Sequence, residues 1–373
     1  MSHTASTKTR GFTLMEMVIA MGLGVIVLGT AVNLFSKALN ASYVVTQRSE
    51  MQQNGRAAVD LMAKDISLAG AGLPSGGVQL PTGNGATSSR FGCDQTQCYI
   101  NNYLYPNGNY FYGAVPNPGA GQSVRTTAGV LGPANDVLSV AYTDSTYPLQ
   151  YYTVTFSSGG AQATFTPPTT TPNPLPNPWP LPAINDPAVG LKIGDLVLFT
   201  NNVGSAIGEV TRVDPGGVAW FQNGDALNIN STTAASGNIA AILAGTNTIA
   251  YRMLMITYYI DTPPGLDGVR YTADDGPPRL MRQMNGQTPV PVAENVAGLQ
   301  VTYDIFDDVS GTATSNLKDA GMSAGKSPNQ IRKINLNVSS RTPLQGMMGG
   351  GFQTLDLATS VSARDMSFKD RYN

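Results

Sequence analysis

One carboxylate, Glu16, lies in an otherwise uncharged apolar segment near the start of the chain. The segment runs from Phe12 to about Phe35, and twenty uncharged residues separate Glu16 from Lys37. In an α-helix, with a rise of ~1.5 Å per residue, they span ~30 Å, the thickness of the hydrocarbon core of a bilayer. A charged group within a membrane helix is costly and is usually functional. The pattern predicts a membrane helix in which Glu16 has a specific partner.

A short polar leader with two basic residues ends at Gly11, and Phe12-Thr-Leu-Met-Glu16 follows directly. This order resembles the cleavage and assembly signal of type IV prepilins and of type II secretion pseudopilins, with no departure in the motif. The resemblance implies cleavage after Gly11 by a prepilin peptidase and methylation of the Phe12 amine. It also implies that Glu16 pairs with the Phe12 amine of a neighbouring subunit. The implied partners are major and minor pilins, which bind through the N-terminal helix, and the inner-membrane assembly platform.

An ordinary secretory signal peptide and a plain membrane anchor are the alternatives. A secretory signal has an apolar core of about 7–15 residues, followed by small residues at the cleavage site, and the apolar run here is longer. A plain anchor gains nothing from Glu16. Basic residues precede the helix and none lies within it. This asymmetry predicts an inner-membrane protein with a cytoplasmic N-terminus and a head on the other side.

The composition argues against nucleic-acid binding and against catalysis. Charged residues make up 12% of the chain and the net charge is −2, so a basic surface that binds nucleic acid is not expected. The single histidine, His3, lies in the leader, which leaves the mature chain without a Ser-His-Asp or Cys-His arrangement. No phosphate loop or dinucleotide fingerprint occurs. The sequence predicts a protein that is not an enzyme, and an acid pair built from aspartates is the enzymatic alternative.

The only two cysteines, Cys93 and Cys98, lie close together in Cys-Asp-Gln-Thr-Gln-Cys. In an oxidising compartment they can close a small loop. Free thiols and a metal site are the alternatives, and a Cys/His zinc site lacks histidine in the mature chain. We expect the disulfide.

An acidic, Gly-rich stretch follows Asp261 and contains Asp267, Asp274 and Asp275. Carboxylate oxygens on such a loop suit Ca²⁺, although the spacing is not that of an EF-hand. The alternative is a solvated hairpin loop, in which Asp and Gly serve turns. Calcium at Asp267, Asp274 and Asp275 is therefore the one cofactor that the sequence suggests.

The helical pattern continues past the membrane segment. Small and apolar residues recur at steps of three and four on one narrow stripe, Met51, Gly55, Ala58, Met62, Ile66 and Ala69. Gly70-Ala-Gly-Leu-Pro74 should end the helix, because Gly caps and Pro forbids continuation. The expected organisation is a leader over residues 1–11, an assembly helix over 12–70 and a head over 71–373.

The head reads as antiparallel sheet, so the predicted class is α+β. Segments rich in Val, Ile, Tyr, Phe and Thr predict ten strands, over residues 136–143, 151–156, 195–200, 207–213, 218–221, 249–260, 279–284, 299–306, 331–340 and 354–361. Residues 167–187 carry nine prolines and predict an extended surface loop, and residues 191–245 predict an inserted β module. Residues 75–122 lack strand or helix periodicity over most of their length, so we expect an excursion. Its tyrosines either pack the loop onto the sheet or form an adhesive surface.

The C-terminal part, from Tyr258-Tyr-Ile to the strand beginning at Ile331, resembles PilW-type minor pilins in order and general character. The two resemblances together cover roughly a third of the chain. Unlike major pilins, this chain has no proline until Pro74, its cysteines come early and it is long. These departures favour a low-copy minor pilin that helps to prime or cap an extracellular type IV pilus (fimbrium). The alternatives are a type II secretion J-type pseudopilin and a dedicated tip adhesin.

Overall fold

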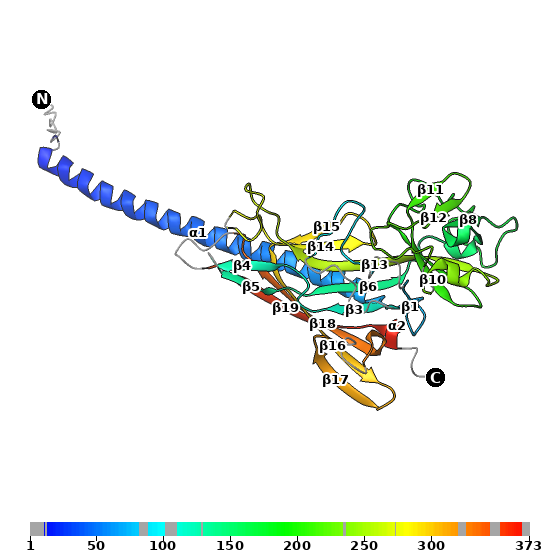
Figure 1. Ribbon diagram of the computed structural model, residues 1–373. Coiled ribbons are helices and arrows are strands. Elements are labelled where there is room, and N and C mark those ends of the chain that lie inside the picture. The colour runs from blue at the N-terminus through cyan, green and yellow to red at the C-terminus, as the bar shows by residue number, and fades with distance from the viewer. Residues whose placement is uncertain are drawn as a thin grey trace, which may run out of the picture. The chain divides into compact units, whose positions relative to one another are not determined.

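The computed structural model describes residues 11, 13–81, 89–100, 110–127, 130–233, 236–272, 274–319, 326–343 and 351–367. By its internal contacts the chain divides into two compact units, Met1–Glu50 and Met51–Asn373. Helix α1 (Leu14–Ser67) begins in the first unit and ends in the second. The predicted α+β class is confirmed, since the second part of this helix packs on an antiparallel β-sheet head (Figure 1).

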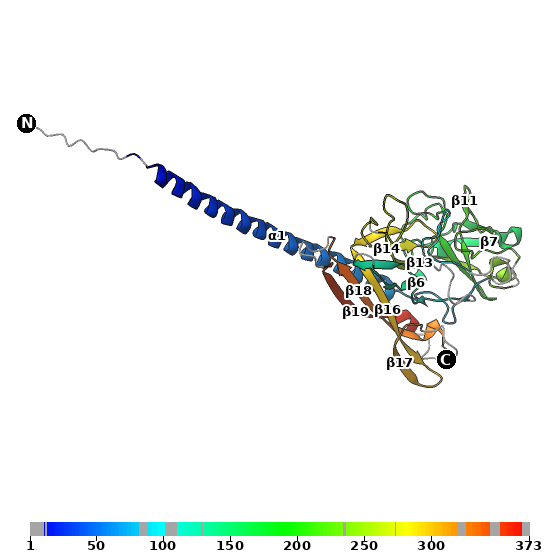
Figure 2. The same cartoon turned by 60° about the vertical axis from the view of Figure 1, so that its left-hand side comes forward.

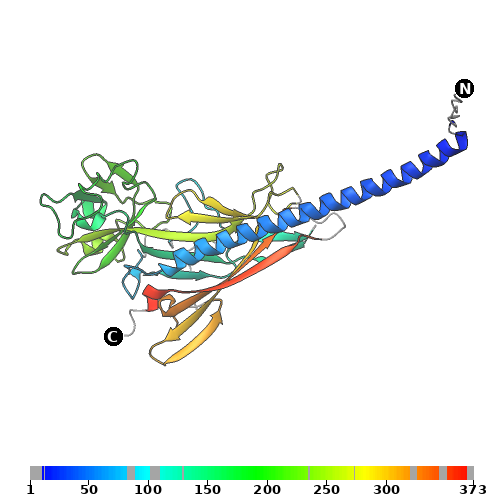
Figure 3. The ribbon, with the colours of Figure 1, turned by 180° about the vertical axis from the view of Figure 1, so that it is seen from behind.

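The stripe predicted on the second part of α1 is the face that the head covers. Met51 is 6% exposed, Ala58, Met62, Ile66 and Ala69 are fully buried, and Gly55 is buried with them. These side chains share one hydrophobic core with strands of two sheets. Figure 3 shows this part of the helix running between the yellow-green strands of one sheet and the red strand β19 (Thr354–Ser362) of the other.

Helix α1 ends where the sequence predicts, at a turn that only glycine tolerates. Gly70 and Gly72 have φ values of 85° and 73°, in the left-handed region that disfavours other residues. A Cβ at Gly72 would lie 2.2 Å from Oγ1 of Thr143. The Gly70 amide donates to the carbonyl of Ala141 at 2.8 Å, so the turn also fastens the helix end to the sheet.

The main sheet has seven antiparallel strands around a long central one, β13 (Ile249–Asp261). One path runs β10-β9-β13-β14-β15, and β13 also pairs with β6, which pairs with β3. The other strands are β3 (Ala114–Asn117), β6 (Val137–Thr143), β9 (Leu196–Thr200), β10 (Ser205–Glu209), β14 (Arg279–Met284) and β15 (Val290–Glu294). Strand β6, Val-Leu-Ser-Val-Ala-Tyr-Thr, is buried in all but its last residue. Helix α1 covers one face of the sheet, and described residues between Leu73 and Phe111 cover the other.

The second sheet has four strands in the order β17-β16-β18-β19. Its other members are β16 (Val296–Asp307), β17 (Thr312–Leu317) and β18 (Ile331–Arg341), and the short helix α2 (Arg364–Ser367) follows β19. A backbone hydrogen bond from the Asp136 N–H to the Leu299 carbonyl, at 3.0 Å, joins it to the main sheet. The hairpin of β16 and β17 projects from the head in Figures 1 and 2.

A smaller sheet, ordered β11-β12-β8-β7, packs on one end of the main sheet around its own hydrophobic core. It comprises β7 (Thr153–Ser157), β8 (Gln162–Thr166), β11 (Arg212–Asp214) and β12 (Val218–Trp220). The remaining strands form two separate two-stranded sheets. One pairs β1 (Val78–Gln79) with β2 (Tyr110–Phe111), and the other pairs β4 (Ser123–Thr127) with β5 (Val130–Ala134). The 3₁₀ turns are η1 (Leu149–Tyr151), η2 (Ser158–Gly160), η3 (Ile239–Ile242) and η4 (Pro328–Gln330).

Each of the ten predicted strand segments overlaps an observed strand, and two expectations need correction. The segment 191–245 supplies β9 and β10 to the main sheet and β11 and β12 to the small sheet, so it does not form a sheet of its own. The predicted strand 207–213 is divided between β10 and β11. The reason is tertiary: β9 pairs with β13 and β12 pairs with β8, both outside the segment.

The stretch 75–122 is also more regular than expected. It contains β1, β2 and β3, and β3 extends the main sheet beside β6 in spite of Pro116. Its side chains form much of the second core, in which Phe91 and Phe111 are almost fully buried and Tyr112 is 9% exposed. Tyr112 therefore packs the excursion onto the sheet. Residues 101–109, which carry Tyr103, Tyr105 and an asparagine pair, lie outside the described positions, and no adhesive role is assigned to them.

Candidate functional site: the assembly helix and its buried anchor

The first turn of α1 carries Glu16 and is closed by a reciprocal capping box. The backbone N–H and the hydroxyl of Thr13 donate to Oε2 of Glu16 at 2.9 and 3.0 Å, and the Glu16 N–H donates to Oγ1 of Thr13 at 3.3 Å. Gly11 is exposed just before it, and Phe12 lies outside the described residues. The pair of Thr13 and Glu16 satisfies orphan N–H groups at the helix start. In the isolated chain Glu16 thus stabilises its own helix.

The segment that follows presents an exposed apolar surface. Leu14 is 83% exposed and Phe35 is 65% exposed. Among the described residues, one helix is long and apolar enough to cross a membrane, and this is α1. A surface of this kind requires lipid or neighbouring helices. Gly22, Gly24 and Gly29 have open space at their Cα atoms, which lets another helix approach closely.

At the other end of α1, Asp65 anchors the helix in the head. It is 3% exposed and accepts hydrogen bonds from the hydroxyls of Tyr142 on β6 and Tyr258 on β13, at 2.9 and 2.6 Å. The Nε of Arg282 on β14 donates to Oδ2 of Asp65 at 2.9 Å. Three adjacent strands therefore converge on one carboxylate, which ties the register of the helix to the main sheet.

The charge state of this anchor follows from its surroundings. Burial raises the pKa of Tyr258, and the hydrogen bond to Asp65 raises it further, so the phenol remains a donor. Burial alone would lower the pKa of Arg282, but the hydrogen bond and charge of Asp65 outweigh it and raise the pKa. Arg282 also compensates the helix dipole, which disfavours a carboxylate in the last turn of a helix. The anchor is a neutral unit of one cation, one anion and two phenols.

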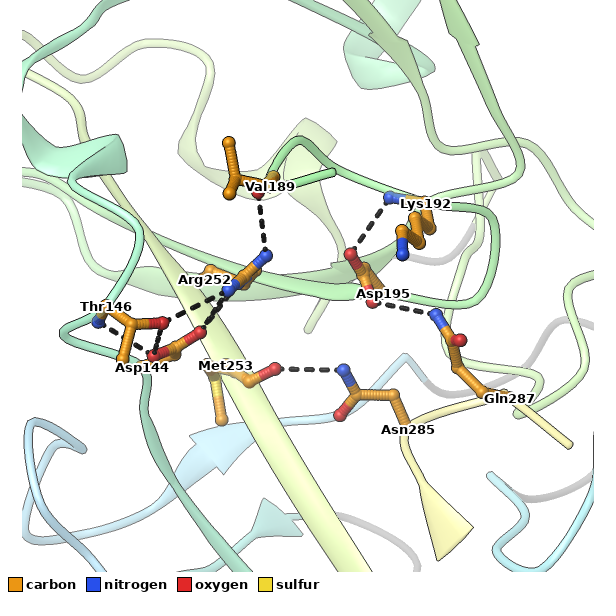
Figure 4. A network of polar contacts seen from close by, with 9 residues as sticks. All are labelled: Asp144, Thr146, Val189, Lys192, Asp195, Arg252, Met253, Asn285 and Gln287. Atoms are coloured by element: carbon orange, nitrogen blue, oxygen red, sulfur yellow. Dashed lines mark hydrogen bonds and ion pairs between the residues drawn. The ribbon is translucent and has the colours of Figure 1, made fainter. Parts of the chain in front are cut away.

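A second polar network fastens the segment that follows the Pro-rich loop to β13 (Figure 4). The Nε and Nη2 atoms of Arg252 donate to Oδ2 of Asp144 at 2.7 and 2.5 Å, and Nη1 donates to the carbonyl of Val189 at 3.2 Å. Nearby, Oδ1 of Asp195 accepts from Nε2 of Gln287 at 2.9 Å. Burial raises the pKa of Asp195. The contacts marked in Figure 4 all join groups of the protein itself, so this network holds the segment in place.

The predicted disulfide is present. Cys93 and Cys98 are bonded with their Cα atoms 4.0 Å apart. Inside the loop, Asp94 accepts from the Thr96 and Gln97 amides at 2.8 and 3.0 Å and from the Tyr99 hydroxyl at 2.5 Å. Burial alone would raise the pKa of Asp94, but the hydrogen bonds outweigh it and lower the pKa to about 2. The loop is therefore held rigid both by the disulfide and by the hydrogen bonds of Asp94.

A buried pair of carboxyl groups, Glu209 and Asp225, lies beside the disulfide loop. Glu209 is fully buried and accepts from Nε2 of Gln95 at 3.1 Å and from the Leu227 amide at 2.8 Å. Burial, and then the adjacent Asp225, raise the pKa of Glu209 well above its ordinary value. Asp225 accepts from the Ile229 amide at 2.7 Å. Two carboxyl groups that share a buried site disfavour each other's ionisation, which is why the pKa of Glu209 rises.

The three aspartates predicted to bind calcium lie in one turn-rich segment, where each accepts a hydrogen bond from a neighbouring residue. Asp267 accepts from the Val269 amide at 2.8 Å, Asp275 accepts from the Tyr271 amide at 2.7 Å, and Asp274 accepts from the Thr272 hydroxyl at 2.7 Å. The described residues contain no group of three or more acidic, histidine or cysteine side chains arranged to hold a metal ion. Calcium binding at Asp267, Asp274 and Asp275 stays a prediction.

Residues 6–32 match the family model for the prokaryotic N-terminal methylation motif. The chain thus carries a type IV pilin-like prepilin signal, of the kind that prepilin peptidase processes in pilins and pseudopilins. The family is structural rather than enzymatic, and the signal and the apolar helix fit a pilin-like protein anchored in the inner membrane. No curated protein and no solved structure matches the chain.

Two features of the site were not predicted from the sequence. The capping box could have been predicted, because Thr13-x-x-Glu16 directly precedes an apolar run. Asp65 gave no such signal, since an aspartate among Lys and Asp residues near a helix end usually faces solvent. Its partners Tyr142, Tyr258 and Arg282 lie 77, 193 and 217 residues away in sequence.

Proposed function

We propose that this chain is a minor pilin-like subunit of the PilW type, which enters a type IV pilus in low copy and helps to prime or cap it. The observation that carries the proposal is the prepilin signal over residues 6–32 on a helix joined to a large, irregular head. The head has three hydrophobic cores and long excursions. These features suit a tip better than a closely packed shaft of repeated subunits.

In this proposal the chain is processed before it assembles. Prepilin peptidase cuts after Gly11, the Phe12 amine is methylated, and Glu16 pairs with the amine of a neighbouring subunit. Pairing compensates a carboxylate that costs at least ~2.5 kcal/mol in an apolar phase. The anchor at Asp65 keeps the head in a fixed register on the part of the helix that it covers.

The processing step is the most direct test. Mass spectrometry of the mature protein is expected to find a chain that begins at Phe12 and carries one added methyl group on its amine. Replacement of Gly11 by a bulky residue should leave the longer chain in the membrane. A mature protein that begins at Met1, or beyond Ala20, contradicts the proposal.

A type II secretion pseudopilin is the second candidate, because the same motif directs its processing. A tip adhesin is the third, and it is favoured by the exposed Pro-rich loop, on which Leu175 is 60% exposed and Trp179 38% exposed. Deletion of the gene separates the three. Loss of surface pili or twitching supports the minor pilin, periplasmic retention of exoproteins supports the pseudopilin, and loss of attachment with intact pili supports the adhesin.

A further inference from the structure

Strand β19 leaves one side of its backbone open. All nine of its residues pair with β18, from Lys333 opposite Ser362 to Arg341 opposite Thr354, with no shift of register. It is the last strand of its sheet, and no described strand pairs with its other side. The open side therefore presents a row of N–H and C=O groups that can accept another strand.

The other sheet edges in the described part of the head are short or blocked. Strand β3 contains Pro116, β15 contains Pro291 and has a register shift against β14, and β17 pairs irregularly with β16. Proline, bulges and inward-pointing charged residues are among the devices by which proteins prevent pairing at edges. Strand β19, Thr-Leu-Asp-Leu-Ala-Thr-Ser-Val-Ser, has none of these devices and is the longest edge strand described.

The side chains of β19 define what an added strand must carry. Those on its inner face, at alternate positions from Leu355 to Val361, are only half-buried, whereas those on the outer face are exposed. A Cβ at Gly55 would lie 2.8 Å from Cδ1 of Leu357, so α1 runs directly behind the strand. Val59 and Ala63, which lie one and two turns after Gly55 on the same face of α1, are also half-buried. An incoming strand with apolar residues at alternate positions would cover this strip.

The direction of β19 argues against antiparallel pairing of two copies through this strand. Gly55 on α1 lies against Leu357, and Gly70, after the helix end, lies against Met366, so the helix and the strand run the same way. Two copies of β19 paired antiparallel about a two-fold axis would therefore point their helices in opposite directions. Chains inserted by the same signal share one direction across the membrane. An antiparallel strand that β19 accepts in an assembled filament therefore comes from a different edge of another subunit.

We propose that β19 accepts an extended strand from the head of a neighbouring pilin-like subunit and so becomes an inner strand of a five-stranded sheet. This proposal rests on the proposed function. The partner strand places apolar side chains toward α1 and polar ones outward. Opposite Asp356, whose Oδ1 accepts from Ser339 at 2.5 Å, it carries a hydroxyl, an amide or a basic group, because like charges opposite each other destabilise a sheet.

The test uses the full chain in cells that assemble filaments. A photo-crosslinking amino acid replaces Ala358, an exposed outer-face residue of β19, and the adducts are mapped by mass spectrometry. We expect adducts on another pilin-like subunit, at positions two residues apart. Thr359→Lys places a charge on the inner face under the incoming strand and should lower the adduct yield about tenfold. Ser360→Lys, on the exposed outer face, is the matched control and should leave the yield unchanged.

Two results overturn the proposal while leaving the proposed function intact. One is a chain that is cut after Gly11 and enters filaments as usual but gives no Ala358 adduct to another subunit, or gives adducts only to itself. The other is an equal loss of adduct in Thr359→Lys and Ser360→Lys. If the chain is not cut after Gly11 or never enters a filament, the proposed function fails and the strand proposal fails with it. Denaturation midpoints of both lysine variants check that the head remains folded.

Discussion

The Nε atom of Arg282 on β14 lies 2.9 Å from Oδ2 of Asp65 on the last turn of α1, and the two residues are 217 positions apart in the chain. This ion pair, with the phenols of Tyr142 and Tyr258, is the polar centre of an otherwise apolar contact between helix and sheet. A helix packed by apolar side chains alone can slide or rotate by small amounts at low cost. A buried ion pair removes that freedom, because any displacement leaves a charge without its partner.

Replacing Asp65 should therefore destabilise the head strongly. Asp65→Ala leaves the guanidinium of Arg282 and two phenols without their acceptor, which should cost about 3–5 kcal/mol of unfolding free energy. Chemical denaturation of the detergent-solubilised full chain measures this loss. Asp60→Ala, on the exposed face of the same helix, is the control and should change the free energy by less than about 0.5 kcal/mol. Equal stabilities of the two variants would contradict the anchoring role.

The carboxyl pair of Glu209 and Asp225 should make the head less stable as the pH rises. The pKa of Glu209 is raised in the folded chain, so folding takes up a proton at pH values above the ordinary pKa of glutamate. The contribution of Glu209 to the unfolding free energy is fully present below the ordinary pKa of glutamate. It is lost as the pH rises from there toward the raised pKa, by up to about 1.4 kcal/mol per pH unit. Glu209→Gln, which mimics the protonated form, should flatten this slope in denaturation series.

Two comparisons make the pH experiment decisive. Glu294→Gln changes an exposed glutamate of β15 and should leave the slope as it is in the unaltered chain. Asp225→Asn removes the like charge and should also flatten the slope, because the raised pKa of Glu209 depends in part on Asp225. If the unfolding free energy of Glu209→Gln still falls with pH at the same slope, other groups are responsible for the pH dependence.

Loss of the disulfide should have a moderate and local effect. Cys93 and Cys98 are five positions apart, and closing so short a loop restricts the unfolded chain by about 2 kcal/mol. The double change of Cys93→Ser and Cys98→Ser should lower the unfolding free energy by about that amount. Reductant should destabilise the unaltered chain similarly and leave the double variant unaffected. Because Asp94 holds the loop from within, hydrogen exchange should increase around residues 93–99 and not across the main sheet.

Removal of the Glu16 carboxylate should separate membrane insertion from assembly. Glu16→Ala keeps the apolar segment, so the chain should still insert, but it should not enter filaments, which immunodetection of sheared filaments measures. Thr13→Val is the matched control, because it removes the hydroxyl of the capping box and keeps the carboxylate. If failure to assemble arose only from a frayed helix start, both variants would fail alike. Normal incorporation of Glu16→Ala would remove the assembly role.

The calcium prediction has a direct calorimetric test. Titration of the full chain with Ca²⁺ up to millimolar concentrations, the range of weak extracellular sites, should give heat of binding if Asp267, Asp274 and Asp275 act together. Changing Asp274 and Asp275 to asparagine should abolish that heat. A flat titration of the unaltered chain removes the prediction and leaves the three carboxylates as turn-forming groups.

The amino-acid sequence by itself determined the parts of this protein that depend on local pattern. The prepilin signal at Gly11, the apolar helix and the buried stripe through Met62 are written in order and spacing, and so are the strands with alternating or fully apolar residues. The end of α1 at Gly70 and Gly72 was also readable, because a positive φ selects glycine. The local disulfide between Cys93 and Cys98 follows from the same short range.

Only the tertiary structure decided how these parts combine. Strands from 191–245 went to two sheets because their partners, β8 and β13, come from elsewhere in the chain. The short strand β3 was obscured by Pro116 and formed because β6 offered it a free side. Asp65 reads as a solvated helix residue until the fold brings Arg282 to it. Contacts between residues some two hundred positions apart leave no periodic trace in a single sequence, so the anchor appears only when the chain is folded.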